Sequence, residues 1–78
     1  MDPKVKEIHL LLIYMTCWEE DSRKEVGGKV LRAWKGYLFE ILDELEEENL
    51  IRQFPKSLVL TKEGKLKAEG LKRKYLRA

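Results

Sequence analysis

The sequence predicts one small α+β domain that is mostly helical and carries a single short β-hairpin. Apolar residues recur at helical spacing in three stretches, 5–18, 37–49 and 64–75. The period changes to two over residues 50–60, where two short apolar runs flank a proline turn. A chain of 78 residues has room for one hydrophobic core, so we expect a single domain over residues 1–78.

The first helix is expected to start at Pro3, with Asp2 as its N-cap. Its core-facing side is predicted to be the stripe formed by Val5, Ile8, Leu12 and Met15, extended by Leu11 and Trp18. The opposite side is also apolar, through Leu10, Ile13 and Tyr14. A helix that is apolar nearly all round is either enclosed by its own domain or shared with another chain, and both alternatives stay open.

The middle of the chain is predicted to hold two more helices. Residues 19–25 are expected to form a solvated linker, which Gly27 and Gly28 end. A short helix is then expected over residues 29–34, with Val30, Leu31 and Trp34 inward, and a turn at 35–36. A longer helix over residues 37–49 has one apolar stripe and an αL position at its end. The residues of that stripe and end are Leu38, Ile41, Leu42, Leu45 and Asn49.

The last third of the chain is predicted to be a hairpin followed by a helix. Residues 50–53 and 58–60 are β-like runs, and Pro55 lies in the turn between them. Thr61 is the expected N-cap of the final helix. Its buried face is expected to be narrow at first and wide later, with small residues that permit a close approach. This face consists of Gly64, Ala68, Leu71 and Tyr75.

This order of elements is that of a winged helix-turn-helix domain, with about four helices and a two-stranded wing. The segment 41–51 and the sequence Leu-Thr-Lys-Glu-Gly at 60–64 resemble winged-helix regulators of the MarR and PadR types. The segments 14–20 and 32–39 are similar to a small bacterial family of short winged-helix proteins. The first resemblance implies DNA binding in transcriptional control, whereas the second brings no activity with it.

The charge pattern qualifies the expectation of DNA binding. Residues 34–50 carry six acidic and one basic residue, and residues 62–78 carry seven basic and two acidic ones. Helical geometry turns Glu40, Asp43 and Glu47 outward, where they would repel the phosphates of a major groove. Contacts to double-stranded DNA are therefore expected at the start of that helix and at the wing. The candidate DNA-binding residues are Lys29, Arg32, Lys35, Tyr37, Arg52 and Lys56.

Two functions follow as hypotheses. The first is a DNA-binding protein that acts as a dimer in transcriptional control. The alternative is a protein–protein interaction module, in which the acidic and basic helices are docking faces. A homodimer is expected in either case, because a core of this size gains stability from a partner subunit. The candidate interface residues are Leu10, Ile13, Tyr14, Trp18, Leu66 and Leu76.

The sequence argues against several other classes. Cys17 is the only thiol and His9 the only imidazole, so neither a disulfide within the chain nor a Cys/His metal cluster is expected. Gly27-Gly28 has no preceding strand of the kind that phosphate-binding loops require. The sequence also shows no nucleophile that is paired with a general base and a third residue to orient that base. We therefore expect no enzyme, no metal and no cofactor. The apolar run 10–15 is too short to span a membrane, and a cytoplasmic protein is expected.

Overall fold

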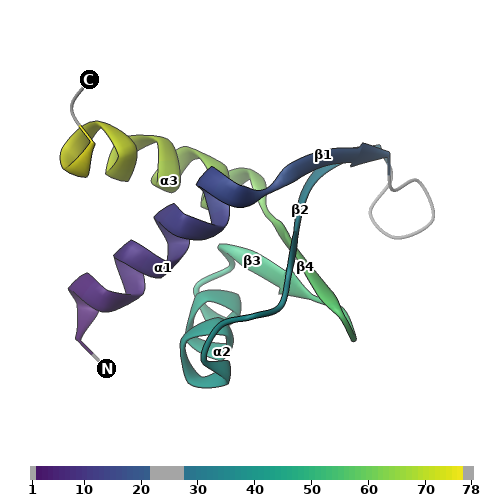
Figure 1. Cartoon of the computed structure of the whole chain (residues 1–78), viewed down its shortest axis with the longest axis horizontal. Helices are drawn as coiled ribbons and strands as arrows, with labels where there is room; N and C mark the ends of the chain where they lie inside the picture. The colour runs from purple at the N-terminus through teal and green to yellow at the C-terminus, as the bar shows by residue number, and fades with distance from the viewer. Residues whose placement is uncertain (1, 22–27, 77–78) are drawn as a thin grey trace.

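The chain forms three helices and a four-stranded antiparallel sheet in the residues that the structure describes. The structure is a computed structural model, and it describes residues 2–21 and 28–76. Figure 1 shows the elements in their chain order. They are α1 (Pro3–Thr16), β1 (Trp18–Asp21), β2 (Lys29–Trp34), α2 (Phe39–Glu47), β3 (Ile51–Gln53), β4 (Ser57–Leu60) and α3 (Lys62–Tyr75).

The sheet has the strand order β1-β2-β4-β3, with every neighbouring pair antiparallel. The predicted hairpin is present as β3 and β4, in which Ile51 lies opposite Leu60. On its other side, Leu60 lies opposite Leu31 of β2. The two inner strands are therefore β2 and β4, and β1 extends the sheet beyond β2.

The predicted architecture of about four helices with a two-stranded wing is wrong. The segment that was expected to be the second helix, residues 29–34, is the inner strand β2. Strand β1 (Trp18–Asp21) consists of Trp18, which was expected on the first helix, and residues 19–21 of the expected linker. Residues 22–27 lie outside the described part of the chain. Six residues are too few for periodicity to separate a helix from a strand. Pairing with β1 and β4, which lie far from each other in sequence, decides the conformation.

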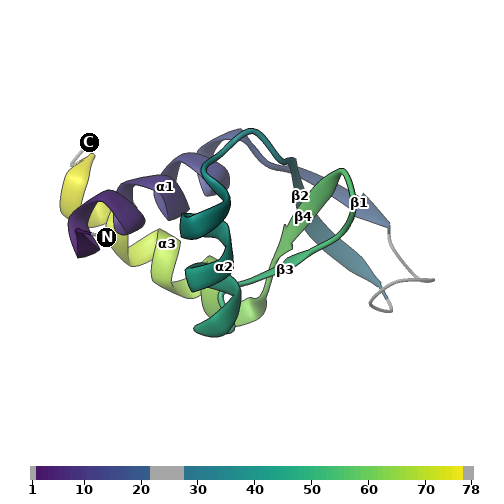
Figure 2. The same cartoon turned by 90° about the horizontal axis from the view of Figure 1, so that it is seen from below.

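The helices gather at one end of the molecule, and the β1–β2 pair projects from the other end (Figures 1 and 2). The two longest helices lie against each other, with α1 towards the viewer of Figure 1 and α3 behind it. The connection from β2 to α2 also runs on the viewer's side, next to the end of α1. This side is called the front of the molecule below.

The core lies where α1, α2 and α3 meet the sheet. Within the cluster, Leu10, Ile13, Ile41, Leu42 and Leu58 have no exposed surface. Leu58 and Leu60 point into this core from β4, and Val59 between them points to the other face of the sheet, since successive side chains of a strand alternate. None of the three helices in the described residues is long and apolar enough to span a bilayer.

Helix α1 faces the core with the side opposite to the one predicted. Asp2 caps it as expected, because its side chain accepts a hydrogen bond from Lys4 N at 2.8 Å. However, Leu10 and Ile13, the expected dimer seam, are completely buried in the domain's own core. Of the expected core stripe, Ile8, Leu12 and Met15 instead face solvent and are 47%, 47% and 49% exposed. Leu11 is buried as expected, and Val5 packs against the core. With apolar residues on both sides, periodicity does not indicate which side the other helices cover.

Helices α2 and α3 follow the predicted faces closely. Ile41, Leu42 and Leu45 of α2 are buried, whereas Leu38, which was expected beside them, precedes the helix and is exposed. Asn49 adopts the predicted left-handed conformation, with φ of 61°. Thr61 caps α3 by accepting a hydrogen bond from Gly64 N at 2.9 Å. The predicted small residues Gly64 and Ala68 are buried, as is Leu71, while Tyr75 is half-buried.

Gly64 is where α3 comes closest to the rest of the chain. A Cβ atom at this position would lie 1.9 Å from the Leu50 carbonyl oxygen, well inside van der Waals contact. Thr61 N also donates to that oxygen at 3.1 Å, which ties the start of α3 to the end of the α2–β3 connection. Glycine is therefore required at position 64 by space rather than by backbone conformation.

Candidate binding surfaces

Six large apolar side chains are exposed on α1 and around the β2–α2 connection, the elements that Figures 1 and 2 show on the front of the molecule, and we call these six residues the front face. Three come from α1 and three from the end of β2 and the start of α2. Its residues are Ile8, Leu12, Met15, Trp34, Leu38 and Phe39, which are between 47% and 71% exposed. The stripe on α1 is exposed because Leu10, Leu11 and Ile13 already occupy the core side of that helix.

A shallow groove of about 350 Å³ joins the two halves of the front face. Leu12 and Thr16 of α1 line one side, and Trp34, Gly36 and Tyr37 line the other. The Tyr37 hydroxyl lies 3.3 Å from Thr16 Oγ1 and fixes the β2–α2 connection beside α1. The groove is therefore a built feature of the fold, with an apolar lining.

Aromatic rings support both ends of this groove. The rings of Trp18 and Trp34 pack with their centroids 5.2 Å apart, and His9 meets Tyr37 edge-on at 6.1 Å. His9 Nδ1 donates to the Val5 carbonyl at 2.8 Å, which orients the imidazole along α1. These contacts leave most of Trp34, 66% of its surface, exposed to solvent.

The remaining candidate interface residues do not meet on one surface. Tyr14 is half-buried near Glu69, and burial, followed by the Glu69 carboxylate, raises the pKa of the Tyr14 hydroxyl. Trp18 lines the groove. Leu66 and Leu76 are 59% and 46% exposed, but both belong to the α3 end of the chain. Of the candidate interface residues on α1, Leu10 and Ile13 are thus buried in the domain's own core, and the exposed apolar side chains of that helix are Ile8, Leu12 and Met15.

The acidic charge of α2 is neutralised only in part by basic residues of the same chain. The Lys6 ammonium pairs with Glu48 and lies 4.0 Å from Glu44, and the hydrogen bond to Glu48 is the main reason why the pKa of Lys6 is raised. The Gln53 side-chain amide donates to Asp43 at 3.0 Å and to Glu46 at 2.9 Å. A surface with this charge does not favour contact with phosphates.

The six candidate DNA-binding residues are divided among separate places. Arg32 is buried, pairs with Glu20, donates to Ser57 Oγ at 2.7 Å and covers the ring of Phe54. Lys29 pairs with Glu19 at 3.4 Å.

The other four candidates are half-buried or exposed. Tyr37 belongs to the groove, and Arg52 is exposed on β3. Lys35 and Lys56 are neighbours, since Lys35 N donates to the Lys56 carbonyl at 3.4 Å. No single basic surface formed by all six residues emerges from this placement.

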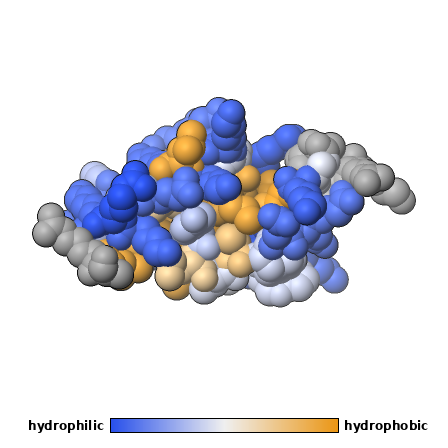
Figure 3. Space-filling view, turned by 90° about the horizontal axis from the view of Figure 1, so that it is seen from above, coloured by the Kyte–Doolittle hydropathy of each residue, from blue (hydrophilic) through white to orange (hydrophobic). Residues whose placement is uncertain are grey.

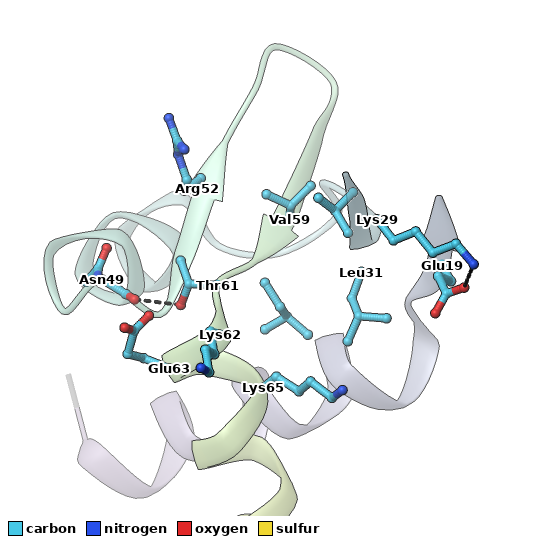
Figure 4. A pocket seen from close by; sticks show the side chains of 12 residues that line it. Glu19, Lys29, Leu31, Asn49, Arg52, Val59, Thr61, Lys62, Glu63 and Lys65 are labelled. Atoms are coloured by element: carbon cyan, nitrogen blue, oxygen red, sulfur yellow. Dashed lines mark hydrogen bonds and ion pairs between the residues drawn. The ribbon is translucent and has the colours of Figure 1, made fainter. Parts of the chain in front are cut away.

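A larger hollow of about 620 Å³ lies between the sheet and the start of α3 (Figure 4). Leu31 and Leu60 contribute apolar surface, and Lys65 of α3 extends below Leu31. Four basic and two acidic residues line it, and Figure 4 shows one of the acids, Glu19, paired with Lys29. The lining is thus apolar in the middle and basic at its border.

The basic residues of α3 divide into two groups on opposite sides of its buried stripe. On one side, Lys67 lies 3.9 Å from Glu48 and Lys74 lies 3.6 Å from Glu7. Four basic residues lie on the other side of the stripe and on the outer surface of the helix, and none of them forms an ion pair with an acidic residue in the described part of the chain. We call this second group the open flank of α3; it consists of Lys62, Lys65, Lys72 and Arg73. The face seen from above, in Figure 3, is hydrophilic over much of its area, and hydrophobic residues are visible between and below the hydrophilic ones.

Chemically reactive groups have ordinary surroundings in the described residues. The Cys17 thiol donates to the Tyr14 carbonyl at 3.0 Å, and burial raises its pKa, which keeps it protonated. No group of three or more His, Cys, Asp and Glu residues that could hold a metal ion is found within residues 2–21 and 28–76. The surfaces above are therefore the features that call for a functional explanation.

Comparison with known proteins assigns the whole chain to one family. The model of the family described as "Domain of unknown function (DUF6429)" matches residues 1–78. The chain belongs to this family. No curated protein and no solved structure matches the chain.

Proposed function

We propose that this DUF6429 domain is a protein-interaction module that forms a homodimer through the front face. The observation that carries the proposal is the amount of apolar surface left there. A fully exposed side chain of this size has roughly 200 Å² of accessible surface. Multiplied by the exposed fractions of the six residues, this gives about 700 Å² of exposed apolar surface on the front face. A monomer rarely exposes a connected apolar patch larger than a few hundred Å². One partner in a stable complex of standard size contributes about 800 Å².

The shape of the front face suits a second copy of the same chain. Ile8, Leu12 and Met15 lie one turn apart along α1, with Leu12 in the middle. When two such helices cross in antiparallel orientation, Ile8 of each approaches Met15 of the other, and the two Leu12 side chains meet near the axis. A surface of this kind is complementary to itself, as a two-fold interface requires.

The chemistry of the front face also favours a protein partner over a nucleic acid. Its six residues carry no charge, and the neighbouring groove is lined by apolar and aromatic side chains. Uncharged aromatic and aliphatic surface is typical of the buried centre of protein interfaces. Phosphates require cations, which lie on other surfaces of this molecule.

Sedimentation analysis over micromolar to millimolar concentrations tests the proposal. We expect a dimer for the natural protein and a monomer for Leu12→Lys, because the new charge would be buried at the axis. The matched control is Leu66→Lys, which changes an exposed leucine outside the front face and should leave the dimer intact. Tryptophan fluorescence provides a second signal, since Trp34 should shift to the blue as the dimer forms.

A natural protein that sediments as a monomer up to millimolar concentration would contradict the proposal. An equal loss of association in Leu12→Lys and Leu66→Lys would also contradict it, because the effect would then follow from added charge alone. Circular dichroism of both variants shows whether the fold is retained. Both substituted leucines are about half exposed, so we expect the variants to fold.

A further inference from the structure

The open flank of α3 differs from every other cationic site on that helix. Its four residues lie along one side and the outer surface of α3, and the first and last are eleven positions, or about 16 Å, apart along the helix. Lys67 and Lys74 sit on the same helix but already have carboxylates within 3.9 Å. A ligand anion at the open flank therefore gains attraction without first breaking an existing ion pair.

We propose that the open flank of α3 binds the phosphodiester backbone of a nucleic-acid duplex. This goes beyond the proposed dimer, because it concerns a different surface and a different class of ligand. Cations in a row of this length can contact successive phosphates along a rigid strand. The hollow at the start of α3 adds Lys29 and Arg52 to the same end of the molecule.

The acidic groups near the flank are few in the described residues. Glu69 lies among the four cations in sequence, but its carboxylate is beside the Tyr14 hydroxyl. Glu63 belongs to the border of the hollow, and Glu19 there is paired with Lys29. The acids of α2 lie on another helix and are engaged by Lys6 and Gln53. The flank therefore carries more basic than acidic residues along its length.

The composition of the flank favours phosphates over a lipid surface. Its exposed apolar residues are Leu66 and Leu76, which are ten residues, or about 15 Å, apart on the helix. A helix that lies on a membrane buries a continuous apolar face, and two separated leucines do not provide one. The four cations have no aromatic or amide side chain among them on α3, and Asn49 is the one amide among the described residues at the border of the hollow, so we infer contacts to the backbone rather than to base edges.

Fluorescence anisotropy with a labelled duplex of mixed sequence tests the inference. The decisive variant is Lys65→Gln with Lys72→Gln, and its matched control is Lys67→Gln with Lys74→Gln. Each double variant loses two positive charges from the same helix, so the two variant proteins have the same net charge. Each lost phosphate contact should lower the slope of log affinity against log salt by about one. We expect a decrease of about two for the first pair and little change for the control pair.

The comparison of ligands is part of the same experiment. DNA and RNA duplexes share the phosphodiester backbone, and a difference between them shows which groove geometry fits the flank. Three results would overturn the inference: no binding of either duplex at low ionic strength, equal losses in the two lysine pairs, or preferential binding of phosphatidylserine vesicles over both duplexes. The Leu12→Lys variant keeps the open flank of α3 intact and should still bind a duplex. Failure of the dimer proposal can therefore be distinguished from failure of the duplex-binding inference.

Discussion

Helices α1 and α3 are equally long, lie against each other and yet present opposite chemistry to solvent. Each has 14 residues and buries one stripe in the shared core. Outside that stripe, α1 exposes Ile8, Leu12 and Met15, whereas α3 exposes a row of lysines and an arginine. Similar packing on the inside therefore coexists with surfaces suited to different partners, one apolar and one anionic.

The difference arises from how each helix meets its neighbours. The small residues Gly64 and Ala68 let α3 approach closely, so its buried stripe is narrow and its remaining surface is polar. α1 fills the core with bulky Leu10 and Ile13 and has more apolar residues than its own domain covers. The apolar surface on α1 and the charge on α3 are what the two proposed interactions, the dimer and the duplex contact, respectively require.

The largest expected effect separates the two sides of α1. Leu10→Ala should lower the free energy of unfolding by about 2–5 kcal/mol, because it leaves a cavity in the core. Leu12→Ala should cost less than about 1 kcal/mol for the isolated domain, as expected for a half-exposed side chain. Denaturant titration at two protein concentrations measures both. Only the Leu12→Ala effect should vary with concentration, and a larger loss at Leu12 than at Leu10 would reverse our assignment of the faces.

The next largest effect concerns the close approach of α3 to the Leu50 backbone at Gly64. Gly64→Ala should destabilise the protein by about 3 kcal/mol, at the upper end of typical overpacking costs, since its Cβ would collide with the Leu50 carbonyl. Gly70→Ala on the same helix is the control, because its nearest atom is 3.8 Å away at the tip of Arg73. In a helix interior this second change should stabilise the protein by about 0.5–1 kcal/mol. Thermal unfolding of the two variants should therefore move in opposite directions.

The smallest effect is the pH dependence of the contact between the two helices. The Tyr75 hydroxyl donates to Glu7 at 2.8 Å, and this bond, with Lys74 nearby, lowers the pKa of Glu7. A lowered pKa in the folded state adds stability above the ordinary value of 4.5 and loses it as the pH falls below that value. In urea titrations, Tyr75→Phe should be less stable than the natural protein at neutral pH, and the difference should shrink in acid. A difference that stays constant into acid would exclude Glu7 as its source.

Much of the local structure could be predicted from particular residues. Asp2 and Pro3 define the start of α1, Thr61 defines the start of α3, and the left-handed turn at Asn49 ends α2. These features depend on neighbours in sequence, so single residues are enough to indicate them. The buried face of α3 was also predictable, because its apolar residues other than Leu66 and Leu76 fall on one side of the helix.

The features that were missed depend on contacts distant in sequence. Val30, Leu31 and Trp34 suit a short helix and a strand equally well, and pairing with β4 selects the strand. Glu19 and Glu20 are poor strand formers, yet they join the sheet because β2 offers them partners. The front face was missed for a related reason, since both sides of α1 are apolar and only the position of α3 decides which is buried.

The two outer strands of the sheet are protected in different ways, which bears on how the protein behaves when concentrated. On β3, the backbone N–H of Gln53 is taken up by a Glu46 carboxylate oxygen at 3.0 Å. On β1, acidic side chains follow one another along the strand, so a second β1 placed beside it would be repelled. Strand-by-strand growth into fibrils is thereby disfavoured at both ends of the sheet. An excess of this protein should instead remain in discrete particles of defined size, even though a large part of its front is apolar.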